Sequence, residues 1–152
     1  PFSFIAPNYF NMQPNPNNNC WLNLNYTKHN ATIYLTYKEV ENNIFELIEE
    51  ARGMVYKHTI KADAINEKRY LNNNKETYGV LYDIHGETAS SVQFYITDSI
   101  QNFIRGALYF EANPNQDSLK PIINYVREDI IRIMESLIWK SETPLKTKTI
   151  EI

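Results

Sequence analysis

Glycine is scarce in this chain, which has four glycines among 152 residues. Phosphate-binding loops depend on glycines where the backbone approaches a nucleotide, and neither G-x-G-x-x-G nor G-x-x-x-x-G-K occurs. A nucleotide-binding loop of either type is therefore excluded. The sequence also lacks an apolar run long enough to form a transmembrane helix.

Cysteine is nearly absent as well, since Cys20 is the only one. A single cysteine excludes an internal disulfide framework and the paired spacings of zinc sites. The three histidines, His29, His58 and His85, do not form H-x-x-x-H or H-E-x-x-H, so no metal or other cofactor is expected. We predict Cys20 on the apolar face of a strand beside Trp21, where a packed, inert thiol is favoured over a nucleophile.

The chain has no excess of positive charge. Its net charge is −3, and Lys and Arg are interleaved with Asp and Glu. Nucleic acids bind basic stripes, so a nucleic-acid partner is not expected. The chain opens on Pro1 without a visible signal peptide, which we interpret as a processed or truncated start with any targeting segment upstream.

Large aromatic side chains are plentiful, with 11 tyrosines and 7 phenylalanines. Such side chains suit strands that have one buried and one wet face, and they also suit protein interfaces. Runs of asparagine at residues 17–19 and 72–74 indicate turns, because asparagine tolerates positive φ and bonds its own backbone.

The first half of the chain predicts three strands and a helix. Alternation of side chains and local composition indicate strands over residues 2–6, 20–26 and 31–37. Pro14 and Pro16 cannot donate to a sheet ladder, so residues 8–19 are predicted as a loop. Apolar residues then recur at helical spacing over residues 44–56, with Asn43 as the N-cap.

The second half predicts four strands and a long helix. The strands, joined by short turns that favour antiparallel neighbours, cover residues 64–71, 78–84, 91–97 and 103–110. From Leu119 to Leu137 an apolar stripe recurs at helical spacing, with Ser118 as N-cap and Pro121 in the first turn.

These elements indicate an α+β fold in a single domain over residues 1–140. We expect an α/β sandwich, in which a mainly antiparallel sheet of about six to seven strands packs against two helices. Residues 141–152 are predicted as an extended tail. Either it docks on a sheet edge or on a neighbouring protein, or it has no biological partner, and the sequence leaves both open.

A dense polar cluster follows the first predicted helix. Its members are Tyr56, Lys57, His58, Lys61 and Asp63. One interpretation is structural, because cations at a helix C-terminus complement the helix dipole. The other is a contact site for a partner or ligand. The sequence leaves both interpretations open.

Asp83 interrupts an apolar strand. By strict alternation it shares a face with Leu81, so its carboxylate is expected at an exposed edge or paired with a cation such as Arg105. A carboxylate within a strand can act as a catalytic acid. However, the sequence places no second carboxylate beside it, and no serine lies in a G-x-S-x-G turn. A structural ion pair is therefore favoured over catalysis.

Several longer runs resemble the gliding motility lipoprotein GldD family. They are residues 31–38 (ATIYLTYK), 56–65 (YKHTIKADAI), 78–84 (YGVLYDI), 89–95 (ASSVQFY), 103–110 (FIRGALYF) and 126–130 (VREDI). The opening PFSF and the strand that starts Cys20-Trp21-Leu22 are similar to this family too. The similarity extends in register from Pro1 to about Lys140.

This resemblance implies an envelope lipoprotein that is required for bacterial gliding and linked to the type IX protein secretion apparatus. It implies a lipid anchor on a cysteine upstream of the domain, which Cys20 cannot be, and a place on the periplasmic side of the envelope. The implied partners are other gliding and secretion lipoproteins and proteins. The family brings no established enzymatic activity and no catalytic residues.

Two functions follow from these observations. The favoured one is a non-catalytic scaffold or stability component, and the alternative is a periplasmic small-ligand-binding protein or hydrolase that uses the His58–Asp63 region or Asp83 with Tyr82. A flat aromatic patch would favour the scaffold, and a concave pocket with convergent polar groups the alternative. Ser99 and Ser118, each in an Asp-Ser-aliphatic context, are predicted O-glycosylation sites.

Overall fold

The structure, a computed structural model, describes residues 1–111 and 116–140. The predicted tail, residues 141–152, lies outside the described residues. No helix in the described part is both long enough and apolar enough to span a membrane.

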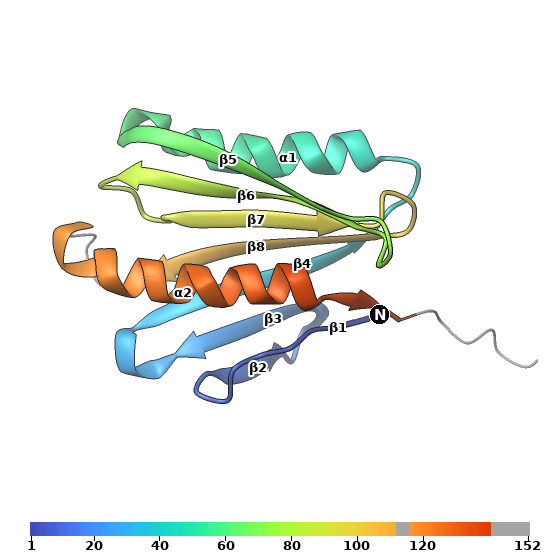
Figure 1. Ribbon diagram of the computed structural model, residues 1–152, viewed down its shortest axis with the longest axis horizontal. Helices are drawn as coiled ribbons and strands as arrows, with labels where there is room; N and C mark the ends of the chain where they lie inside the picture. Colours follow the sequence, from blue (N-terminus) through green and yellow to red (C-terminus); the bar gives the residue numbers. More distant parts are fainter. Residues whose placement is uncertain (112–115, 141–152) are drawn as a thin grey trace, which may run out of the picture.

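A seven-stranded antiparallel sheet forms the body of the molecule, in the order β2-β3-β4-β8-β7-β6-β5 (Figure 1). The strands are β2 (Asn11–Asn15), β3 (Asn18–Tyr26), β4 (Ala31–Glu39), β5 (Ala62–Asn72), β6 (Thr77–Gly86), β7 (Val92–Thr97) and β8 (Asn102–Phe110). β4 pairs with β8, so the first three strands of the sheet join the last four at its centre. A separate two-stranded sheet pairs β1 (Phe2–Ser3) with β9 (Ile138–Trp139).

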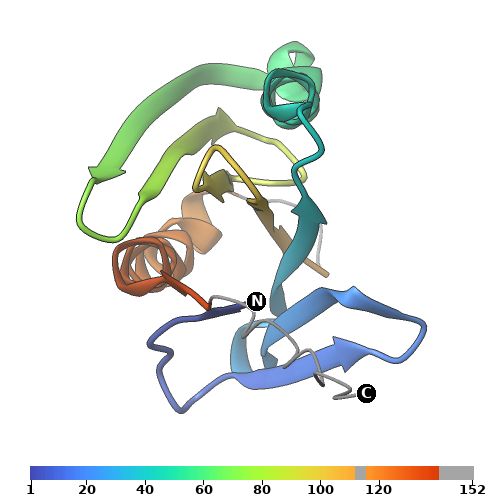
Figure 2. The same ribbon diagram turned by 90° about the vertical axis from the view of Figure 1, so that its right-hand side faces the viewer.

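The two helices, α1 (Ile44–Tyr56) and α2 (Gln116–Ser136), pack on opposite faces of the sheet. The sheet curves around α2, whereas α1 lies on its outer side (Figure 2). The core on the α2 face includes Leu24, Ile33, Leu81, Phe94, Ile104, Val126 and Ile130. The core on the α1 face includes Leu47, Ala51, Val55, Tyr82, Tyr95 and Phe103. The predicted α+β fold, an antiparallel sheet with two packed helices, is confirmed.

Side-chain alternation explains why one sheet supports two cores. In β8, Ile104 belongs to the core under α2, and its neighbour Phe103 belongs to the core under α1. Successive residues of a strand point to opposite faces, so a central strand covered on both sides is buried throughout. All six residues of β7 are buried for this reason, whereas the edge strand β5 is mostly exposed.

The predicted loop over residues 8–19 is partly wrong, because β2 forms within it. β2 pairs with β3, and Pro14 lies opposite Leu22 in this ladder. β2 is an edge strand, where a residue without an amide donor is tolerated because one side of the strand has no partner. The register shifts directly after Pro14, which ends the regular pairing.

Two other local predictions are also corrected. Cys20 is exposed rather than packed, because it precedes the ladder between β3 and β4, which begins at Trp21. Ser118 lies inside α2, which begins at Gln116, and is therefore not the N-cap. Asn43 does occupy the N-cap position of α1. Its side-chain oxygen, however, accepts a hydrogen bond from the Glu41 amide instead of one from the helix.

Candidate functional site

The predicted contact cluster lies where α1 ends, in the short helix η2 (Lys57–Ile60) and the start of β5. Tyr56, Lys57, Lys61 and Asp63 are exposed, and His58 is half-buried. The Tyr56 hydroxyl donates a 2.8 Å hydrogen bond to Glu67. The described part shows no hydrogen bond or ion pair between His58 and Asp63. The cluster is therefore a surface patch rather than an assembled reactive pair.

Asp83 pairs with Arg127 of α2, not with Arg105. The Arg127 guanidinium donates from Nε to Oδ1 at 2.7 Å and from Nη2 to Oδ2 at 2.9 Å. This fork raises the pKa of Arg127. The predicted structural ion pair of Asp83, on the same face as Leu81, is therefore present. Arg105 was the wrong partner, because this residue of β8 lies on the α1 face of the sheet. Tyr82 also faces α1, so alternation separates it from Asp83.

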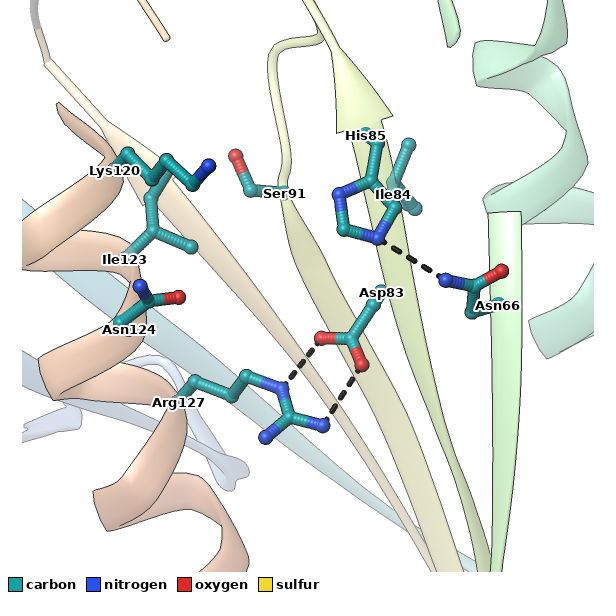
Figure 3. Close-up of a pocket in the computed structure, with 9 residues that line it drawn as sticks. All are labelled: Asn66, Asp83, Ile84, His85, Ser91, Lys120, Ile123, Asn124 and Arg127. Carbon is teal, nitrogen blue, oxygen red and sulfur yellow. Dashed lines mark hydrogen bonds and ion pairs between the residues drawn. The ribbon is translucent and has the colours of Figure 1, made fainter. Parts of the chain in front are cut away.

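A pocket of about 430 Å³ lies between α2 and the ends of β5, β6 and β7 (Figure 3). The Asp83–Arg127 pair forms one wall of it, and Asn66 Nδ2 lies 3.2 Å from His85 Nε2 on the strand side. The other polar lining groups are Ser91, Lys120 and Asn124. Within the described residues these three side chains make no hydrogen bond or ion pair.

The pocket does not assemble a hydrolytic triad. Such a triad needs a nucleophile bonded to a base and the base bonded to an orienting acid. Within residues 1–111 and 116–140, Ser91 makes no hydrogen bond to His85, and Asp83 is bonded to Arg127 instead of His85. The described residues also contain no group of three or more His, Cys, Asp or Glu that could hold a metal ion. What the described residues form here is a pocket with both polar and apolar lining.

A second concavity, the α1 groove, lies beside α1 on the outer side of the sheet. It has a volume of about 210 Å³ and is lined by Trp21, Thr36, Tyr37, Lys38, Leu47, Glu50, Ala51, Met54, Phe103 and Arg105. Trp21 is 49% exposed at its rim. Lys38 and Glu50, also at the groove, form a 2.8 Å ion pair.

Arg105 is the unusual residue of the α1 groove. Its Nη2 donates to Gln93 Oε1 at 2.7 Å, but its buried Nε has no acceptor, and neither has the buried Nε2 of Gln93. Burial lowers the pKa of Arg105. Burial and, to a lesser degree, the charge of Arg105 also lower the pKa of His58. Sequence reasoning missed this site, although an arginine inside the apolar run FIRGALYF was a usable signal.

A third polar cluster is structural. The buried carboxylate of Asp129, on α2, accepts hydrogen bonds from Tyr9 at 2.6 and 2.8 Å and from Tyr26 at 3.0 Å. Burial, together with the charge and hydrogen bond of Asp129, raises the pKa of both phenols. These bonds hold the N-terminal segment against α2. Sequence patterns do not reveal these bonds, because Tyr9 precedes Asp129 by 120 positions.

The two serines predicted to be glycosylated are both exposed. Ser99 lies in the β7–β8 turn with φ of 70°, in the left-handed region. Ser118 lies in the first turn of α2, where the helical backbone leaves less room for an enzyme to bind an extended peptide. Both serines stay predictions, and Ser99 is the better placed.

The chain thus forms an α+β fold with two notable features. One is the pocket between α2 and the sheet, and the other is the half-buried Arg105, which has no ion-pair partner among the described residues. The family described as Gliding motility lipoprotein GldD matches residues 1–139, and the chain belongs to this family. The family recognised from the sequence is thereby confirmed. No curated protein matches the chain. Membership places the chain among gliding motility lipoproteins, which are associated with the cell envelope.

Proposed function

We propose that this domain is a non-catalytic scaffold or stability component of the gliding motility and type IX secretion machinery. It works on the periplasmic side of the envelope, held by a lipidated cysteine upstream of this chain, and docks on other envelope lipoproteins and proteins. The observation that carries the proposal is the outer sheet face beside α1. There, the exposed aromatic side chains of Trp21 and Tyr34 lie on the same sheet face as Arg105.

The composition of this outer face supports docking of a protein. Trp21 and Tyr34 are 49% and 45% exposed, and the Tyr34 ring contacts Tyr109 edge-on with centroids 5.8 Å apart. Trp21 lies opposite Thr36, and Thr36 opposite Arg105, so these side chains form one strip across β3, β4 and β8. Tryptophan, tyrosine and arginine are the residue types that dominate the binding energy of protein interfaces.

The predicted contact cluster extends this surface, and its role is tested by the double variant His58→Ala/Asp63→Ala. We expect the domain to fold normally, and its affinity for envelope partners to fall about tenfold, or about 1.4 kcal/mol. The measurement is recovery of gliding and secretion proteins with the cross-linked lipoprotein from native envelopes. Gliding speed is scored in parallel.

The matched control is Asn74→Ala/Glu87→Ala, which likewise removes one carboxylate and one neutral polar side chain, here from two exposed positions. It is expected to leave recovery unchanged. Normal gliding and full partner recovery by the His58/Asp63 variant, at wild-type protein levels, would remove the cluster from the docking surface. If the wild-type protein itself recovers no gliding or secretion protein, the scaffold proposal fails.

The alternative function, small-ligand binding on the periplasmic side, is favoured by one observation. Ser91, Lys120 and Asn124 converge unengaged on the pocket of Figure 3, whose volume of about 430 Å³ lies within the range of small-molecule sites. A thermal-shift screen of envelope metabolites separates the two functions. A compound that stabilises the wild-type domain, but not Lys120→Met, would favour ligand binding.

A further inference from the structure

Arg105 carries a positive charge, and no carboxylate of the described residues forms an ion pair with it. A guanidinium stays protonated in proteins, and burying an unpaired charge is unfavourable. Its one hydrogen-bond acceptor among the described residues is the neutral amide oxygen of Gln93. The buried Nε has no acceptor at all. A domain that merely needed to fold would be more stable with an apolar side chain of similar length at this position.

The carboxylate of Glu50 lines the same groove but is not bonded to Arg105. The charge of Glu50 acts on Arg105, but its carboxylate is bonded to Lys38 at 3.1 and 2.8 Å. His58 lies close enough for the two positive charges to interact unfavourably when it is protonated. The charged residues that line the α1 groove are Lys38, Glu50 and Arg105. Lys38 and Glu50 pair with each other, so the charge of Arg105 is left over, and the groove complements an anion.

The dimensions of the groove indicate what kind of anion fits. Small-molecule sites have volumes of about 300–1,000 Å³. The α1 groove, at about 210 Å³, is smaller, yet it has room for one inserted side chain. Trp21 at the rim and Met54 on α1 supply the apolar contacts that a protein segment around such a side chain would cover.

We propose that the α1 groove receives an Asp or Glu side chain of an envelope partner protein, and that Arg105 is the residue that binds its carboxylate. The inference rests on the proposed scaffold function and names the contact through which the scaffold docks. A guanidinium binds a carboxylate through two parallel N–H···O bonds. The Nε atom is buried, but Nη1 makes no hydrogen bond among the described residues and is the donor that an incoming carboxylate can reach. Docking then provides the counter-charge that the isolated domain lacks.

The test separates stability from binding through Arg105→Met. Methionine keeps the length of the side chain and removes the charge, so the isolated domain is expected to melt at or above the wild-type temperature. Recovery of envelope partners is expected to fall at least tenfold. Arg132→Met, an exposed arginine on α2, is the matched control and should change neither quantity. Arg105→Lys keeps the charge without the fork and should recover partners only in part.

A direct probe uses the purified chain and two amides of equal size. N-acetyl-glutamate amide is titrated at constant ionic strength while the ¹⁵N resonance of Arg105 Nε is followed, and N-acetyl-glutamine amide is the neutral control. The glutamate probe is expected to shift this resonance more than the glutamine probe. Equal shifts from the two probes would contradict carboxylate binding at Arg105.

The outcomes distinguish this inference from the function on which it rests. A lowered melting temperature of Arg105→Met would show that Arg105 stabilises the fold, and would overturn the inference. Full partner recovery by this variant would also overturn it and leave the scaffold function intact. If the wild-type chain recovers no envelope partner, the scaffold function fails first.

Discussion

Replacing Ile130 by aspartate is expected to unfold the domain. Ile130 is fully buried at the centre of α2, in the core that the curved sheet surrounds. A carboxylate there would be buried without a partner, at a cost of several kcal/mol. The total stability of a domain is about 5–15 kcal/mol, so this change removes much or all of it.

The neighbour of Ile130 shows why the effect depends on hydrogen-bond partners. Asp129 is just as buried, but the hydroxyls of Tyr9 and Tyr26 solvate its carboxylate. Circular dichroism melts of Ile130→Asp and of the control Ile130→Val measure the difference. The valine variant is expected to lose only about 0.5–1.5 kcal/mol. A melting temperature of Ile130→Asp within a few degrees of wild type would mean that Ile130 lies outside the core.

Replacing Gly106 by valine is expected to have the second-largest effect. Gly106 lies in β8 between Leu35 of β4 and Phe94 of β7. A Cβ atom at this position would overlap the ring of Phe94 and come within 3.0 Å of Leu35 Cδ2. Phe94 is itself 1% exposed and packs in the core under α2. Overpacking a core in this way costs about 1–3 kcal/mol, and the two further methyl groups of valine add to it.

A double-mutant cycle tests the proposed cause. If the Phe94 ring is the obstacle, Gly106→Ala combined with Phe94→Leu should be more stable than the sum of the two single changes predicts. Urea unfolding of the four proteins gives the coupling free energy. Additive effects would place the strain elsewhere in the sheet.

Alternation and helical spacing were sufficient to predict most of the fold. The spacing from Leu119 to Leu137 reflects a helix that buries one long stripe, and α2 does so. The alternation of residues 31–37 likewise reflects the two faces of β4. β2 was missed because proline argues against a strand unless its edge position is known. An edge position depends on the assembled sheet, which local sequence does not reveal.

The candidate sites were harder to predict, because they depend on which helix covers which face. Alternation placed Asp83 with Leu81 correctly, but it could not show that α2 brings Arg127 to that face from 44 positions away. The α1 groove could not be predicted for the same reason, because the sequence does not show which sheet face α1 covers. Arg105 was considered as a partner of Asp83, whereas the structure places the two on opposite faces of the sheet.

The pairing of β4 with β8 has a consequence for the kinetics of folding. The strands β2, β3 and β4 are neighbours in sequence, and so are β5 to β8. The ladder between β4 and β8, in contrast, joins residues far apart in sequence: it pairs Ala31 with Phe110 at one end and Glu39 with Asn102 at the other. Contacts of this kind require closure of a long loop before they stabilise the chain, which slows folding. Until this ladder forms, β4 and β8 each present an unpaired edge that could pair with another chain. Conditions that delay the central ladder should therefore promote aggregation of newly made protein, even where the finished domain is stable.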